Sequence, residues 1–195
     1  MIEKFLYIIA GCNGAGKTTA SFTILPEILH CDQFVNADEI AKGLSPFRPE
    51  SVAFEAGRIM LSRIEQLFAE NQTFAIETTL AIKIYKNKII EAREKGYQVV
   101  LLFFWLESAE MAIDRVRIRV AEGGHDIPED VIIRRYYSGI KNLFDIYIHI
   151  VDQVMVFDSS KALPDTIAFK TLETDFTIHN SEKFNIIKSI YHGSK

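Results

Sequence analysis

The sequence predicts an α/β fold, an open and mainly parallel sheet of five strands with helices on both faces. Short apolar runs alternate along the chain with segments whose apolar residues recur at helical spacing. Strand–helix–strand connections of this kind are right-handed and build parallel sheets covered on both sides. At the first such junction, residues 11–18 read Gly-Cys-Asn-Gly-Ala-Gly-Lys-Thr and fit the phosphate-binding pattern G-x-x-x-x-G-K-[ST]. Together these observations predict a three-layer P-loop NTPase fold, with the ligand beyond the carboxyl ends of the strands.

The first half of the chain is expected to contain three strands, at residues 5–10, 33–36 and 73–77. Residues 18–25 start the first helix, directly after the phosphate-binding pattern, so that the helix N-terminus adds its dipole to the phosphate site. A further helix over residues 50–70 is indicated by apolar residues at helical spacing: Ala56, Ile59, Met60, Ile64 and Leu67.

The next helix and strand follow from an apolar stripe and an apolar run. The stripe consists of Ile82, Tyr85, Ile89 and Ala92. Gly96 fits the C-terminal stop of that helix, because glycine readily adopts the left-handed conformation found there. Residues 99–106 are continuously apolar, as expected of a central parallel strand that is buried on both faces.

Two helices separated by a glycine break are predicted next. Ser108 is expected to cap a helix that runs to about Ala121, and Gly123-Gly124 breaks the chain. Residues 126–129, Asp-Ile-Pro-Glu, resemble a capping box with proline in the first turn, followed by a long helix to about residue 147. Residues 154–158 then form the fifth strand.

The segment 161–195 is less regular. Residues 167–171 and 176–179 suit short edge strands, and residues 182–191 suit a closing helix. No repeat or long linker interrupts the pattern, so residues 1–195 are expected to form a single domain.

The composition is that of an ordinary globular protein, with 48% hydrophobic and 25% charged residues and a net charge of -4. No basic tail indicates a general attraction to nucleic acid, although a local basic groove is compatible with this charge. No apolar stretch reaches the length of a membrane span, and the first strand begins too early for a signal peptide. The two cysteines, Cys12 and Cys31, form neither a disulfide framework nor a zinc site. These features predict a protein of the reducing cytoplasm.

The phosphate-binding pattern assigns a chemical role to each part of the loop. Its backbone N–H groups cradle the phosphates, Lys17 reaches the β- and γ-phosphates, and the Thr18 hydroxyl ligates Mg²⁺. Cys12 is either a small residue at a variable position or an oxidisable thiol within the loop. The residues expected to contact the nucleotide are Gly11, Cys12, Asn13, Gly14, Ala15, Gly16, Lys17, Thr18 and Thr19.

Two carboxylates stand at the ends of neighbouring strands. Asp38 follows the second strand and can accept the proton of an attacking hydroxyl as a general base, or it can cap the helix that begins there. Glu77 ends the third strand and can bind the acceptor, hold a magnesium-bound water, or order the Thr78-Thr79 turn.

Arginines flank the glycine break and suit a helical lid over residues 115–135. Arg115 and Arg119 share one helix face and Arg117 points elsewhere, while Arg134 and Arg135 lie beyond the break. A helix–loop–helix that swings over the nucleotide would bring Arg119 and Arg134 onto the transferred phosphate. His125, in the connection, either contacts the substrate or packs locally.

With these motifs in order (residues 11–18, Asn36-Ala37-Asp38, Glu77-Thr78-Thr79 and the arginine-flanked Gly-Gly-His), the chain resembles the zeta toxin family over residues 5–160. The resemblance implies the fold of nucleoside-monophosphate kinases. It also implies transfer of the ATP γ-phosphate to the 3′-hydroxyl of UDP-N-acetylglucosamine-type sugars, and a protein antitoxin as partner.

Carried over by motif, Lys17 and Thr18 would hold ATP and Mg²⁺, and Asp38 would be the catalytic base. Glu77 and Thr79 would line the acceptor pocket, and Arg119 and Arg134 would be the lid arginines.

The leading hypothesis is an ATP- and Mg²⁺-dependent kinase that phosphorylates a hydroxyl of a small molecule, such as a nucleotide sugar. Two alternatives share the phosphate loop. One is a slow ATPase switch that acts with a protein partner, in which Asp38 and the arginines are structural. The other is a nucleic-acid 5′-hydroxyl kinase, which the acidic balance and the lack of a basic stripe disfavour.

Overall fold

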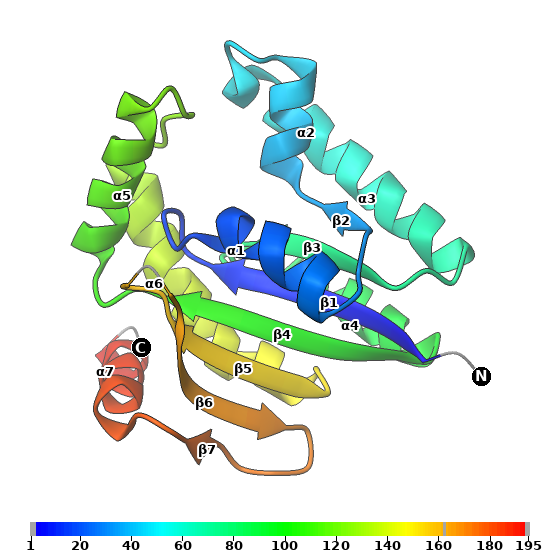
Figure 1. Ribbon diagram of the computed structural model, residues 1–195, viewed down its shortest axis with the longest axis vertical. Coiled ribbons are helices and arrows are strands. Elements are labelled where there is room, and N and C mark those ends of the chain that lie inside the picture. The colour runs from blue at the N-terminus through cyan, green and yellow to red at the C-terminus, as the bar shows by residue number, and fades with distance from the viewer. Residues whose placement is uncertain (1–2, 162, 194–195) are drawn as a thin grey trace.

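The computed structural model describes residues 3–161 and 163–193. Its central element is a seven-stranded sheet in the order β2-β3-β1-β4-β5-β6-β7 (Figure 1). The first five strands pair in parallel, whereas β6 and β7 run antiparallel at one edge. The strands are β1 (Lys4–Gly11), β2 (Phe34–Val35), β3 (Phe74–Thr78), β4 (Tyr97–Trp105), β5 (Gln153–Asp158), β6 (Asp165–Thr171) and β7 (Thr177–Ile178). The predicted α/β fold with five parallel strands is confirmed, and the two predicted edge segments extend the sheet.

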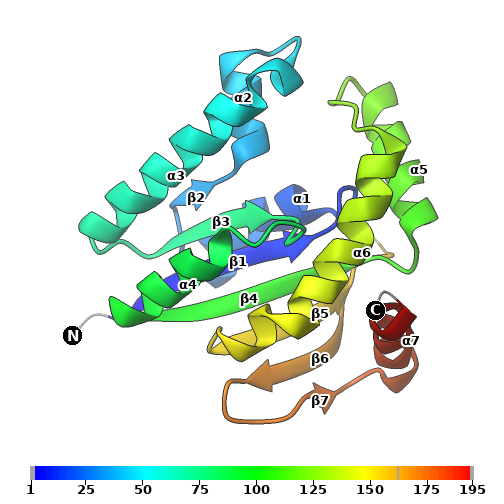
Figure 2. The same cartoon turned by 180° about the vertical axis from the view of Figure 1, so that it is seen from behind.

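Helices cover both faces of this sheet. The α-helices are α1 (Lys17–Thr23), α2 (Ala37–Leu44), α3 (Ala53–Ala69), α4 (Tyr85–Glu94), α5 (Ala109–Ala121), α6 (Glu129–Asp145) and α7 (Ser181–Gly193). Helix α1, which continues into a π-helical turn at Ile24–Ile28, lies on the face toward the viewer in Figure 1, and α4 and α6 lie on the opposite face (Figure 2). This arrangement is the predicted three-layer architecture.

The core forms where the two central strands lie. Ile8 of β1 is opposite Ile76 of β3 and Leu101 of β4, and all three side chains are buried. Continuously apolar strands are stable here because helices exclude water from both faces of the sheet. The strands end at the edge where the phosphate loop begins, so the core fixes the position of that loop.

Two local predictions are wrong. Residues 126–129 do not form a capping box, because α6 begins at Glu129 with Pro128 as its N-cap and without a side-chain cap. Asp126 instead accepts a hydrogen bond from the Ile127 N–H, too early in the chain to serve the helix. Ile82 is not part of the apolar stripe of α4, because the helix begins only at Tyr85 and the Ile82 side chain is exposed. The Ile82 carbonyl accepts a hydrogen bond from the Tyr147 hydroxyl.

Candidate active site

The phosphate loop connects β1 to α1 and is held tightly against its neighbours. A Cβ added at Gly11 would lie 2.2 Å from the Phe104 carbonyl oxygen, and one at Gly14 would lie 2.8 Å from the Ala112 carbonyl oxygen. Both glycines also have positive φ angles, of 143° and 77°. Only glycine therefore allows the loop to lie this close to β4 and α5.

The Lys17 ammonium is buried at the centre of the site. It donates a 2.9 Å hydrogen bond to the Cys12 carbonyl and lies 3.5 Å from Glu77 Oε1. A buried ammonium is stable only when it is paired, and these two contacts supply the partners. Cys12 is buried, and burial raises the pKa of its thiol to about 11, which disfavours the thiolate form.

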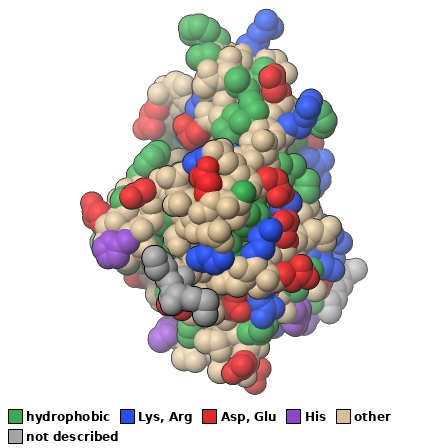
Figure 3. Space-filling model, turned by 90° about the vertical axis from the view of Figure 1, so that its right-hand side faces the viewer, with side chains coloured by type: hydrophobic (Ala, Val, Ile, Leu, Met, Phe, Trp, Pro, Cys, Tyr) green, Lys and Arg blue, Asp and Glu red, His purple; other side chains and the backbone are tan. Residues whose placement is uncertain are grey.

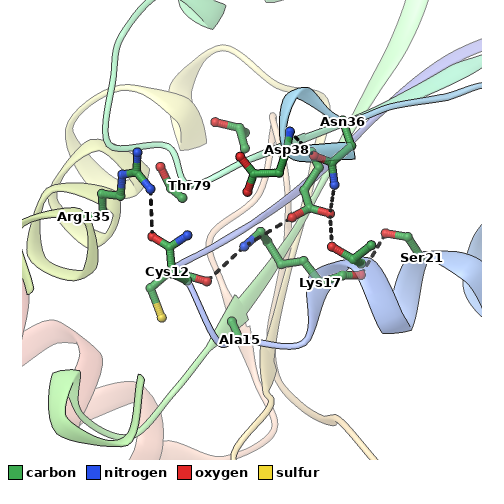
Figure 4. A network of polar contacts seen from close by, with 12 residues as sticks. Cys12, Ala15, Lys17, Ser21, Asn36, Asp38, Thr79 and Arg135 are labelled. Carbon is green, nitrogen blue, oxygen red and sulfur yellow. Dashed lines mark hydrogen bonds and ion pairs between the residues drawn. The ribbon is translucent and has the colours of Figure 1, made fainter. Parts of the chain in front are cut away.

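Glu77 links the phosphate loop to the end of β2. Its Oε2 accepts hydrogen bonds from Thr18 Oγ1 at 2.7 Å and from Asn36 Nδ2 at 2.8 Å (Figure 4). Because a hydroxyl carries one proton and two lone pairs, donation to Glu77 leaves the Thr18 oxygen free to ligate a cation. The Thr78-Thr79 turn does not depend on Glu77, because each threonine hydroxyl accepts a bond from the backbone N–H two residues on.

Asn36 caps α2 and thereby leaves Asp38 available. The Asn36 side chain accepts hydrogen bonds from the backbone N–H groups of Asp38 and Glu39, so the alternative in which Asp38 caps the helix is wrong. Within residues 3–161 and 163–193, the Asp38 carboxylate makes no hydrogen bond or ion pair. It is exposed, lines the cavity and is directed toward the same space as Lys17 (Figure 4).

A cavity of about 430 Å³ opens over these residues. One wall comes from α2, α3 and the turn between them, and the opposite wall comes from α5 and the connection after it. The lining residues are Asn13, Gly14, Gly16, Lys17, Thr18, Thr19, Ala37, Asp38, Glu39, Ala41, Lys42, Pro49, Glu50, Ala53, Glu77, Arg115, Ile118, Arg119, Glu122 and His125. Thr79 does not line this cavity.

The arginines around the glycine break occupy three different environments. Arg115 binds the carbonyls of Ser159 and Ser160, and Arg119 lines the cavity while it donates a 2.7 Å hydrogen bond to the His125 carbonyl. Arg117 is exposed and pairs with acidic neighbours away from the cavity.

Beyond the break, Arg135 and Arg134 differ sharply. Arg135 is half-buried and donates a 3.1 Å hydrogen bond to Asn13 Oδ1 in the phosphate loop. Burial lowers the pKa of Arg135, and the nearby Asp38 carboxylate acts in the opposite direction. Arg134 is exposed on α6 and does not line the cavity. Arg115 and Arg119 line the cavity, whereas Arg135 does not line it but reaches the phosphate loop through Asn13. The sequence spacing alone could not choose between the adjacent Arg134 and Arg135.

His125 lies at the mouth of the cavity, where its Nδ1 is 3.6 Å from a carboxylate oxygen of Glu50 on the opposite wall. Among the described residues, no group of three or more His, Cys, Asp or Glu side chains could hold a metal ion. A cation at this site would therefore rest on Thr18, Glu77 and the ligand itself. In the same part of the chain, no helix is long and apolar enough to cross a membrane.

The sequence profile of the Zeta toxin family matches residues 2–166. The chain belongs to the zeta toxin family. A curated relative in Haemophilus influenzae, described only as an uncharacterized protein, is 27% identical over 143 residues, which is 70% of this chain and 100% of that protein.

Solved structures share the fold of this zeta-toxin-family chain. The AvrRxo1-ORF1:AvrRxo1-ORF2 complex with sulphate ions matches with a TM-score of 0.75 and 18% identity over 96% of this chain. This chain spans 64% of the matched AvrRxo1 chain, just under two thirds of its length. The PezAT toxin–antitoxin system of Streptococcus pneumoniae matches with a TM-score of 0.64 and 14% identity, over 100% of this chain and 88% of that one. The family and the fold place the protein among the P-loop kinases.

Proposed function

We propose that the protein transfers the γ-phosphoryl group of ATP to a hydroxyl of a small molecule, with Asp38 as the general base. The observation that carries this proposal is the Asp38 carboxylate, which faces the cavity beside the phosphate loop and has no partner among residues 3–161 and 163–193. A switch that only binds ATP has no need of an unpaired carboxylate beside the phosphates.

The donor half of the site consists of the phosphate loop, Lys17 and Thr18. The loop N–H groups and the Lys17 ammonium bind the phosphate oxygens, and ATP would take the place of the Cys12 carbonyl as a partner of Lys17. The Thr18 oxygen, oriented by its bond to Glu77, would hold Mg²⁺. When bound, Mg²⁺ neutralises charge on the phosphates.

The acceptor half lies between Asp38 and Glu77. As the acceptor oxygen bonds to the γ-phosphorus, its proton passes to the Asp38 carboxylate, and the bond from the γ-phosphorus to the bridging oxygen breaks to release ADP. Arg119 and Arg135 are the cations placed to stabilise charge on the transferred group, so we assign Arg135 the lid role that the sequence spacing gave to Arg134.

Kinship within the zeta toxin family makes nucleotide sugars of the UDP-N-acetylglucosamine type the first acceptors to test. A protein antitoxin is the proposed partner, supported by the toxin–antitoxin system named for the PezAT structure. The net charge of -4 supports a small acceptor over a nucleic acid. On the face shown in Figure 3, which lies at the opposite end of the sheet from the phosphate loop, acidic and basic side chains are interspersed.

The test is incubation of the protein with γ-labelled ATP and Mg²⁺ and a panel of nucleotide sugars, nucleosides, free sugars and an RNA oligonucleotide. We expect label in one small acceptor and a loss of about 10²–10⁴-fold in kcat for Asp38→Asn. Glu55→Gln, an exposed carboxylate of α3 outside the cavity, serves as the matched control. Label recovered only as inorganic phosphate, or full activity of Asp38→Asn, would contradict the proposal.

A further inference from the structure

Helix α7 reaches the sheet edge that carries the phosphate loop. It begins at Ser181, beyond the family match that ends at residue 166, and its Lys183 forms an ion pair with Asp158, the last residue of β5. The Asp158 side chain is 1% exposed. Burial by itself raises the pKa of Asp158, but hydrogen bonds from Lys183 and Ser160 outweigh burial and lower that pKa, so the carboxylate is charged.

The Asp158 carboxylate helps to fix the turn after β5, at residues 158–160. Asp158 Oδ1 accepts a 2.9 Å hydrogen bond from the Ser160 N–H, and the Ser159 N–H donates to the Trp105 carbonyl at the end of β4. These bonds place the Ser159 hydroxyl against the phosphate loop, where it donates a 2.7 Å hydrogen bond to the Ala15 carbonyl.

Arg115 makes a second connection between the turn and the loop. Its guanidinium donates to the carbonyls of Ser159 at 2.7 Å and Ser160 at 2.9 Å, and it also lies 3.5 Å from the Gly14 carbonyl oxygen. Two successive carbonyls of the phosphate loop, those of Gly14 and Ala15, are therefore bound by Arg115 and Ser159.

A peptide unit is planar, so a fixed carbonyl also fixes the N–H on its other side. The Ala15 carbonyl shares its peptide with the Gly16 N–H, and the Gly14 carbonyl shares its peptide with the Ala15 N–H. In a phosphate loop the free backbone N–H groups point toward the phosphates. The Ala15 N–H donates to the Cys12 carbonyl at 3.3 Å, so the contact made by Arg115 supports the fold of the loop itself. The contact made by Ser159 sets the direction of the Gly16 N–H, which is a phosphate-binding donor.

We propose that Lys183 is a positioning residue for the nucleotide, which acts through Asp158 and Ser159 to orient the Gly16 N–H in the phosphate loop. The inference rests on the proposed function only in that ATP binds at this loop. It assigns to α7, which lies outside the family match, a role in nucleotide affinity rather than in covering the sheet alone.

The experiment measures the dissociation constant of a fluorescent ATP analogue for the full chain. We expect Lys183→Met to weaken binding about 3- to 30-fold, the range found for residues that act on a site without contacting its ligand. Lys183→Arg keeps the positive charge that pairs with Asp158, so this variant is expected to bind the analogue with nearly wild-type affinity. The matched control is Lys188→Met on the same helix, because Lys188 lies over the Phe144 ring, 4.5 Å from its centroid, and among the described residues it forms no hydrogen bond or ion pair with the turn. The affinity of this variant should equal that of the wild type.

Removal of one partner from a buried ion pair often destabilises a protein, so a second variant keeps the test decisive. Ser159→Ala removes the link to Ala15 and leaves the ion pair in place. If Lys183 acts through Ser159, the double variant Lys183→Met/Ser159→Ala should bind the ATP analogue about as tightly as the single variant with the lower affinity. The inference about Lys183 would be overturned if Lys183→Met or Ser159→Ala bound the analogue with wild-type affinity. It would also be overturned if the losses of affinity were additive in the double variant. Neither result would affect the proposed function. A wild-type protein that binds no nucleotide would overturn the proposed function together with it.

Discussion

At the scale of the residue, the site depends on a division of tasks between neighbouring polar side chains. Asn36 accepts hydrogen bonds from the first N–H groups of α2 and also donates to Glu77, so the Asp38 carboxylate, two residues on, is not needed as a cap and forms no hydrogen bond or ion pair within the described part of the chain. Glu77 in turn pairs with the Lys17 ammonium and accepts a hydrogen bond from the Thr18 hydroxyl. An unpaired carboxylate can thus stand beside the phosphate loop because its neighbours carry the structural contacts.

The two adjacent arginines of α6 give the sharpest residue-level prediction. Arg135→Ala should lower kcat about 10²–10³-fold, because it removes a cation from the place where charge develops on the transferred phosphoryl group. Arg134→Ala, an equal change on the exposed face of the same helix, should alter kcat by less than about threefold. Steady-state kinetics with the identified acceptor checks this pair, and a larger loss in Arg134→Ala would return the lid role to Arg134.

At the scale of the element, α6 connects the phosphate loop to the loop after β3. Its Asn142 donates a 2.7 Å hydrogen bond to the Leu80 carbonyl, and its Gly139 packs directly on the Thr79 carbonyl. The loop after β3 is therefore attached to the helix that carries Arg135. Movement of α6 would shift that loop and the arginine together.

Gly139→Ala is expected to destabilise the protein by about 1–3 kcal/mol, because the added Cβ would lie 2.6 Å from the Thr79 carbonyl oxygen and force the helix away from the loop. Gly57→Ala in α3 is the control, since nothing lies within 4 Å of a Cβ at that position. It should stabilise the protein by about 0.5–1 kcal/mol through the higher helix propensity of alanine. Urea unfolding measures both free energies, and equal effects of the two changes would contradict this view of α6.

At the scale of the whole molecule, the cavity exists because distant segments of the chain meet over the carboxyl ends of the parallel strands. The residues that face each other across the cavity, from α2 and α3 on one wall and from α5 on the other, are more than fifty residues apart in sequence. Glu50 and His125 form a pair between the two walls. Ligand binding between such walls is expected to depend on their movement relative to each other.

Burial of weak acids throughout the core predicts sensitivity to alkaline pH. Burial raises the pKa of Cys12 and Cys31 from 9.0 to about 11. Burial also raises the pKa of five tyrosines: Tyr7, Tyr85, Tyr97, Tyr136 and Tyr147. Because these groups keep their protons longer when folded, the unfolded chain binds fewer protons above pH 9, and stability falls as pH rises from about 9 to about 11.

Urea unfolding at pH 8 and at pH 10.5 tests this expectation through a lower midpoint at the higher pH. Cys12→Ala removes one of the groups, so its loss of stability between the two pH values should be smaller by on the order of 2 kcal/mol. An unchanged midpoint for the wild type would show that these side chains titrate with ordinary pKa values.

The sheet, the phosphate loop and the candidate carboxylates could be predicted from the sequence, because these features depend on local patterns. Apolar runs and helical spacing predict the parallel strands and helices, and a contiguous eight-residue pattern identifies the loop. Confirmed details such as the Ser108 cap, whose side chain accepts from the Met111 N–H, lie within four residues of one another.

Tertiary packing determines which arginine of α6 reaches the phosphate loop and which side chains fix the loop carbonyls. The choice between Arg134 and Arg135 depends on the rotation of α6 against the sheet, and the link from Lys183 to the loop joins segments 25 residues apart and then 144 residues apart. Tertiary packing brings these residues together, and a local periodicity in the sequence does not predict which distant residues will meet.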